Sequence, residues 1–227
     1  MSFAMTHLAI AKEINDKIHI ANDLPQFFLG ILAPDSVHCR EGYHGDMKKN
    51  SHFVINKKPW GSIASIQECD DWFDYFSPNI KPRENHQRSD FYMGCLIHIL
   101  TDISNTRKIY VPFVEWCDRE NKTRDEVRSL FYSDCRQIDM ALFNTLPWKD
   151  EVWALMLKAQ GETIGSIINA TEAEKYRDVS FERFIQGEYE PDKPQNLITV
   201  DDNFRFIEDT VDEIISLLKV DHSVATV

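Results

Sequence analysis

Five side chains of the kinds that bind metal ions are spread over the first half of the chain. They are His7, Asp35, His52, His98 and Asp102. Three imidazoles and two carboxylates offer the nitrogen and oxygen ligands that suit Zn²⁺, and also Mn²⁺ or Fe²⁺. If the fold brings these side chains together, their chemistry predicts a metal site.

The most informative pair is His98 and Asp102, which are four residues apart. On a helix, side chains at this spacing project from the same face. Phe91, Gly94 and Cys95 fall on that face as well, which predicts that it is buried. A histidine and a carboxylate are costly to bury together unless they pair with each other or hold a metal ion.

Each of these residues also has a simpler explanation. His7 shares an apolar stripe and could be an ordinary core histidine. His98 and Asp102 could form a buried ion pair without a metal. Asp35 follows a proline, where aspartate is common in turns, and His52 could be a solvated loop residue. The five together make a stronger case for a site than any one of them alone.

The segments that would position these residues are mostly helical. Hydrophobic spacing, caps and prolines predict helices over residues 4–20, 23–32, 62–76, 87–115, 124–146, 148–159, 171–186 and 201–219. Asp23 is the expected N-cap of the second helix, with Pro25 in its first turn. Pro112 should kink or split the fourth helix. Between Asp35 and Trp60 no period persists, so this stretch is predicted to be a long loop.

No segment shows the alternation of a β-strand over a length that would build a sheet. The chain has no internal repeat, and no change in composition divides it. The sequence therefore predicts a single all-α domain over residues 1–220, followed by a frayed tail at 221–227.

Composition restricts the function classes. The chain has 227 residues and a formal net charge of −12, which argues against a nucleic-acid partner or an anionic membrane surface. No apolar run is long enough to span a membrane, and the start of the chain lacks the features of a secretory signal. The five dispersed cysteines are Cys39, Cys69, Cys95, Cys117 and Cys135. We expect a cytoplasmic protein with reduced thiols.

Four segments resemble the zinc-dependent phospholipase C family, which is related in fold to the S1/P1-type nucleases. They are Met5–His7, Leu29–Asp35, Lys49–Phe53 and Tyr92–Asp102. Their order and spacing carry the resemblance, which spans about the first half of the chain. The second half adds little beyond its helical pattern.

This resemblance implies an all-α fold and hydrolysis of phosphodiester or phospholipid head-group bonds at zinc ions. By the family pattern, Asp35, His52, His98 and Asp102 would bind one metal ion. Asp102 would also bridge to a second ion that takes His7. Asp35 would in addition orient or deprotonate the attacking water.

The chain departs from the family pattern after Asp102. His222 is the only later histidine, so the family's third metal site is not expected here. Asp134 and Asp139 are both candidates for a further ligand to the second ion, and periodicity does not choose between them. Lys48, Lys49, His38 and His44 lie in the predicted loop, where they could contact a substrate or simply be solvated.

The sequence thus predicts a metal-dependent hydrolase of phosphoester bonds, with one or two ions of Zn²⁺, or of Mn²⁺ or Fe²⁺. The expected substrate is a small phosphoester or a phospholipid-like molecule, and the oligomeric state stays open. One alternative is a degenerate relative with a single structural or binding metal and no catalysis. A second is a helical interaction protein without a metal, for which the amphipathic segment 201–219 would be a docking element.

Overall fold

A computed structural model describes residues 4–54, 60–80, 89–187 and 197–220 of the chain. Within these ranges the protein is all-helical, with one isolated β-bridge between Ile164 and Ile168 and no strand. The helices form a single compact domain, as the sequence predicts. The predicted tail at 221–227 lies outside the described residues.

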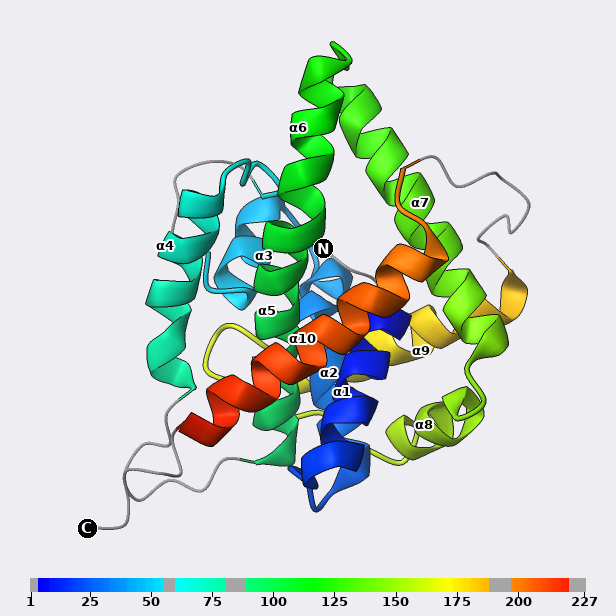
Figure 1. Ribbon diagram of the computed structural model, residues 1–227. Helices are drawn as coiled ribbons and strands as arrows, with labels where there is room; N and C mark the ends of the chain where they lie inside the picture. Colours follow the sequence, from blue (N-terminus) through cyan, green and yellow to red (C-terminus); the bar gives the residue numbers. More distant parts are fainter. Residues whose placement is uncertain (1–3, 55–59, 81–88, 188–196, 221–227) are drawn as a thin grey trace.

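The helices follow one another in the order in which Figure 1 labels them. Their bounds are α1 Ala4–Ile18, α2 Leu24–Leu32, α3 Gly45–Ser51, α4 Ile66–Phe76, α5 Asp90–Asn105, α6 Val111–Arg119, α7 Arg124–Thr145, α8 Lys149–Met156, α9 Ala170–Gln186 and α10 Val200–Val220. Three shorter elements join them, namely the 3₁₀ segments η1 Ala33–Cys39 and η2 Ser77–Asn79 and the π-helical segment η3 Thr106–Tyr110.

Capping residues set several of these helix starts. Asp23 caps α2 by accepting a hydrogen bond from the backbone N–H of Gln26 at 3.2 Å, as predicted. Thr123 and Glu126 form a capping box at the start of α7. These interactions satisfy backbone N–H groups that have no partner within the helix. The sequence-level signals therefore located these helix boundaries well.

One prediction about helix continuity is wrong, whereas the break expected in the helix over 87–115 is present. The stretch 35–60 is not one long loop, because its described part contains the end of η1 and the short helix α3. The chain also passes from α5 to α6 through η3, so the change of geometry begins before Pro112. Pro112 lies in the first turn of α6, where its missing N–H costs little.

The centre of the fold is the crossing of α2 and α5. Gly30 and Gly94 face the partner backbone there so closely that an added Cβ would lie 2.0 Å from the Phe91 carbonyl oxygen and 2.2 Å from that of Phe27, respectively. Only glycine allows this approach. The crossing fixes α5 against the segment that leads into η1.

The other helices enclose this crossing. Figure 1 shows α10 lying across α1, and α6 and α7 forming an antiparallel pair that projects from one end of the molecule. A large buried cluster joins apolar side chains from α1, α2, α5, α7 and α10. In the described part of the chain, no helix is both long and apolar enough to cross a membrane.

Candidate metal site

The fold brings the five predicted ligand residues together from four separate elements. His7 lies in the first turns of α1, Asp35 in η1, and His52 directly after α3, while His98 and Asp102 lie on α5. The side chains of His7, His52, His98 and Asp102 are each at most 2% exposed, and that of Asp35 is 15% exposed. This cluster of five is therefore a buried polar site within an apolar core.

Hydrogen bonds to backbone carbonyls orient two of the imidazoles. Nδ1 of His98 donates to the carbonyl oxygen of Ile31 at 2.7 Å, and Nδ1 of His52 donates to that of Lys48 at 2.9 Å. A carbonyl oxygen can only accept, so the proton of each ring lies on Nδ1. Each Nε2 is then left with its lone pair, as in a metal-bound histidine.

These two Nε2 atoms point at each other. They are 3.1 Å apart, and His52 Nε2 is also 3.3 Å from Asp35 Oδ1 and 3.4 Å from Asp102 Oδ2. His98 Nε2 is 3.8 Å from the same Asp102 oxygen. The two Nε2 lone pairs and Asp102 Oδ2 face one another without a proton on either nitrogen, and a metal ion among them would remove the resulting repulsion.

The spacing suits a metal ion of the expected kind. A tetrahedral ion with nitrogen and oxygen ligands about 2.0–2.2 Å away holds them about 3.3–3.6 Å from one another. The three contacts of His52 Nε2 and the contact between His98 Nε2 and Asp102 Oδ2 range from 3.1 to 3.8 Å. The group of Asp35, His52 and His98 therefore fits one ion in both chemistry and size, and Asp102 lies within 3.4 Å of His52 Nε2 beside it.

The pKa shifts agree with a site built for a cation. Burial lowers the pKa of both His52 and His98 below the usual value of 6.5, and the neighbouring His7 lowers that of His98 further. Both rings are then neutral at pH 7. Burial alone would raise the pKa of Asp35, but the Lys48 ammonium and the His52 imidazole hold it well below its usual range. Asp35 is accordingly ionised.

His7 extends the cluster on the far side of Asp102. Its ring stacks on that of His98, with centroids 3.9 Å apart, and its Nε2 lies 3.3 Å from Asp102 Oδ1. Asp102 thus turns one oxygen to His7 and the other to His52 and His98. Two groups of three could hold an ion, namely His7 with His98 and Asp102, and Asp35 with His52 and His98. They share the single available nitrogen of His98.

Asp134 and Asp139, the two candidates for a further ligand, have other roles. Asp139 Oδ1 accepts hydrogen bonds from the backbone N–H groups of Met5 at 2.8 Å and Thr6 at 3.3 Å. Asp134 Oδ2 accepts from those of Leu197 and Ile198. Burial raises the pKa of Asp139 to about 8. Neither acid belongs to the groups that could hold a metal, so both are structural acceptors in the described part of the chain.

Lys48 lies beside the cluster and is buried, whereas the sequence alone left open whether it is a substrate contact or a solvated loop residue. Its Nζ lies 2.6 Å from Asp35 Oδ1, and its side chain is only 9% exposed. The amine also lies 4.9 Å from the centre of the Trp60 ring and 3.4 Å from His38 Nε2. Lys48 is four residues before His52, so recognising α3 as a helix would have placed both on one face.

The cluster reaches solvent along one edge. Asp35 is the most exposed member of the cluster, and Asp35 and the buried Lys48 beside it adjoin His38 and Tyr43, which are exposed. The His38 and Tyr43 rings are in contact, with centroids 4.5 Å apart. A small molecule entering the site would therefore meet the Asp35–Lys48 edge first.

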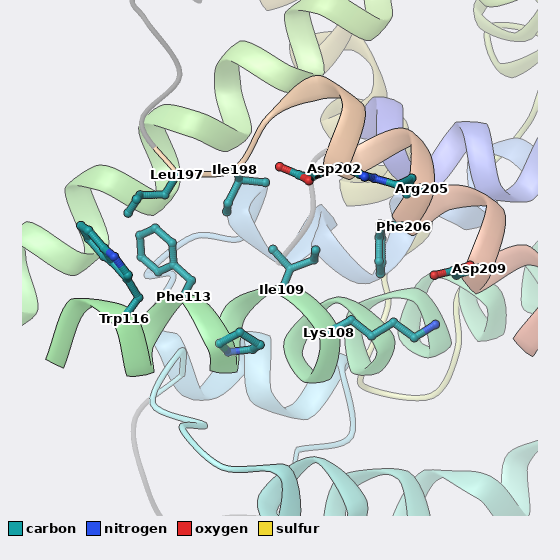
Figure 2. A pocket seen from close by; sticks show the side chains of 11 residues that line it. Lys108, Ile109, Phe113, Trp116, Leu197, Ile198, Asp202, Arg205, Phe206 and Asp209 are labelled. Atoms are coloured by element: carbon teal, nitrogen blue, oxygen red, sulfur yellow. Dashed lines mark hydrogen bonds and ion pairs between the residues drawn. The ribbon is translucent and has the colours of Figure 1, made fainter. Parts of the chain in front are cut away.

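A separate hollow of about 530 Å³ lies between α6 and α10 and includes none of the five cluster residues. Figure 2 shows Phe113 and Trp116 on one wall and Leu197 and Ile198 on the other. Its two basic residues are paired with acids of α10, Arg205 with Asp202 at 2.6 Å and Lys108 with Glu213 at 2.8 Å. Nothing in this hollow indicates a ligand of particular chemistry.

Comparisons with known protein families, with curated proteins and with solved structures found no match for this chain. The evidence for function therefore comes from the geometry and chemistry of the cluster itself.

Proposed function

We propose that this protein is a metal-dependent hydrolase of phosphoester bonds. The observation that carries the proposal is the convergence of buried imidazole and carboxylate groups, in which Asp35, His52 and His98 form one group that could hold an ion and Asp102 contacts both histidines. The four segments that resemble zinc-dependent phospholipase C contain these residues, which supports the reaction class. Zn²⁺ is the expected ion, with Mn²⁺ or Fe²⁺ as alternatives.

A metal ion bound there would polarise a phosphoryl oxygen and lower the pKa of a bound water. The residues of the chain have distinct parts in this proposal. His52, His98 and Asp102 are fully buried and hold the ion from the interior. Asp35 lies at the open edge and is ionised, so it can accept a proton or a hydrogen bond from the attacking water.

The proposed substrate is a small phosphomonoester or phosphodiester. The anionic phosphate would enter along the edge formed by Asp35 and Lys48, where the cluster meets solvent. The acidic net charge of the chain does not oppose this, because the ion and Lys48 set the local potential.

One observation favours a second candidate, a metal site that binds or stabilises without catalysis. Four protein ligands complete a tetrahedral shell, and closed shells of this kind are typical of structural zinc. In the first candidate, water or substrate must occupy one coordination position of the ion. Asp35 would therefore not ligate the ion at that position during the reaction. The two candidates therefore differ in whether the loaded protein turns over a phosphoester.

The first experiment is elemental analysis of the purified protein beside a His98→Ala, Asp102→Ala double variant, followed by a phosphoester screen. Bound metal that is lost in the variant, together with turnover by the wild-type protein, would support the hydrolase. Bound metal without turnover would favour the structural candidate. No metal in either protein, after incubation with each of the three ions, would exclude both.

A further inference from the structure

We propose that Lys48 is the second cation of this site, and that its ammonium binds an anionic phosphate oxygen beside a single metal ion. This inference rests on the proposed function and names the residue that recognises the substrate. A two-metal hydrolase uses its second ion to neutralise and hold phosphate oxygens. In this chain, the amine of Lys48 lies 2.6 Å from Asp35, at the position where that function is needed.

Lys48 lies directly beside a proposed metal ligand. Its Nζ lies 2.6 Å from Asp35 Oδ1, the ligand oxygen at the open edge, and its side chain is almost fully buried. Burying an ammonium group costs free energy unless a nearby opposite charge compensates it. An ordinary ion pair on the protein surface would not require this burial. The amine lies at the edge where an entering phosphate would arrive.

The backbone of Lys48 is hydrogen-bonded to one of the proposed metal ligands. Its carbonyl oxygen accepts hydrogen bonds from His52 Nδ1 at 2.9 Å and from Ser51 Oγ at 3.0 Å. The ring of Trp60 lies 4.9 Å from the ammonium and limits its movement on another side. The same residue thus orients the imidazole of His52 and presents a fixed charge next to Asp35.

A single divalent ion would leave the centre without net charge. The carboxylates of Asp35 and Asp102 each carry one negative charge as metal ligands, so one divalent ion and these two groups are neutral in sum. A neutral centre attracts a phosphate weakly, whereas the charge of Lys48 makes it positive by one unit. The ammonium can also donate up to three hydrogen bonds, which suits a phosphate with several anionic oxygens.

Few ligand atoms of the described residues remain for a second ion. His98 has one nitrogen available, because its Nδ1 donates to Ile31. Asp134 and Asp139 are engaged with backbone N–H groups. Of the described residues, His7 and Asp102 are therefore the ones left to a second ion, and two ligands hold an ion weakly. The geometry favours one metal ion together with Lys48.

The test measures the affinity of inorganic phosphate for the zinc-loaded protein by calorimetry, together with its metal content. Lys48→Met removes the charge at similar volume, and Lys48→Arg keeps it. Lys49→Met is the matched control, since Lys49 lies on the same helix but pairs with the exposed Asp46 at 3.7 Å. If Lys48→Met does not fold, Lys48→Gln replaces it.

We expect one ion per chain in the wild-type protein and in all variants. The dissociation constant of phosphate should rise about tenfold or more in Lys48→Met, stay unchanged in Lys49→Met and be partly restored in Lys48→Arg. Two tightly bound ions in the wild-type protein would overturn the proposal. So would unchanged phosphate affinity in Lys48→Met, absence of phosphate binding in the wild type, or loss of the ion in Lys48→Met.

This outcome is separable from that of the proposed function. Phosphate binding that depends on Lys48, without turnover of any phosphoester, would support the anion site and contradict the hydrolase. Turnover of a phosphoester, together with a phosphate affinity that is unchanged in Lys48→Met, would support the hydrolase and contradict the proposed role of Lys48.

Discussion

At the residue scale, Asp35 differs from the other members of the cluster. It is the ligand-type residue at the open edge, and it contacts both Lys48 and His52. If Asp35 only ligated the ion, loss of its charge would lower activity through loss of the ion. If it also activates water, loss of its charge should lower activity while the ion stays bound. Asparagine keeps the shape of Asp35 and can still ligate through oxygen, but it cannot accept a proton.

We predict that Asp35→Asn lowers kcat by about 100-fold or more while the protein still holds its ion. Steady-state kinetics and elemental analysis of the same preparation check this. His98→Gln is the comparison, and it should lose both the ion and activity. If Asp35→Asn lost the ion in proportion to its activity, Asp35 would be a ligand without a separate catalytic role.

The protonation of His52 and His98 makes a second prediction at this scale. Metal binding competes with protons only where the ligands are protonated. Because burial lowers both pKa values below 6.5, the affinity for zinc should stay nearly constant as the pH falls from 8 to about 6.5 and decline only at lower pH. Competition titrations with a chelating dye at a series of pH values measure this. A decline centred at about 6.5 would contradict the lowered pKa values.

At the element scale, the crossing of α2 and α5 determines the site. Gly94 lets α5 approach α2, and this approach brings His98 Nδ1 to the carbonyl oxygen of Ile31. Asp35 follows α2 through η1, so its distance from α5 depends on the same contact. The close packing of the α2 and α5 backbones therefore sets the positions of His98 and Asp102 on α5 relative to Asp35.

We predict that Gly94→Ala destabilises the fold by about 1–3 kcal/mol, because its Cβ would overlap the backbone at the Phe27 carbonyl. It should also weaken metal binding by displacing His98. Chemical denaturation and elemental analysis measure the two effects. Gly45→Ala is the control, since its added Cβ would lie 3.7 Å from Trp60 Cβ, an ordinary contact. Equal stability of the two variants would mean that the crossing can relax.

At the scale of the whole molecule, the cluster joins distant parts of the chain. The five residues come from α1, η1, the end of α3 and α5, so an ion would connect elements across the domain. An unfolded chain cannot present these ligands together, and the ion should therefore stabilise the folded state. The two carboxylates would also lose their strongest partner on its removal.

We predict that a chelator lowers the Tm by about 5–10 °C. A ligand at about 100 times its Kd contributes about 2.7 kcal/mol, and for a chain of this length 1 kcal/mol corresponds to about 2–4 °C. Differential scanning calorimetry with and without chelator measures the shift, which added zinc should reverse. The His98→Ala, Asp102→Ala variant should show no shift. An unchanged Tm in the wild-type protein would argue against an ion that spans these elements.

The sequence alone determined most of the helical framework and the members of the cluster. The cap at Asp23 and the spacing of His98 and Asp102 are local features, which a single sequence shows directly. The fold class followed from periodicity. The resemblance to zinc-dependent phospholipase C added the grouping of His7, Asp35 and His52 with that pair, which no local pattern contains.

The tertiary structure decided what depends on contacts between distant segments. Asp134 and Asp139 are indistinguishable by periodicity, and only the packing of α7 against α1 and the segment at Leu197 showed that both accept backbone N–H groups. Lys48 was predicted to lie in a loop, because α3 is too short to show a clear helical period. The burial of Lys48 depends on contacts with η1 and Trp60. A side chain's neighbours from far along the chain set its charge, burial and role, and those neighbours are known only once the helices are packed.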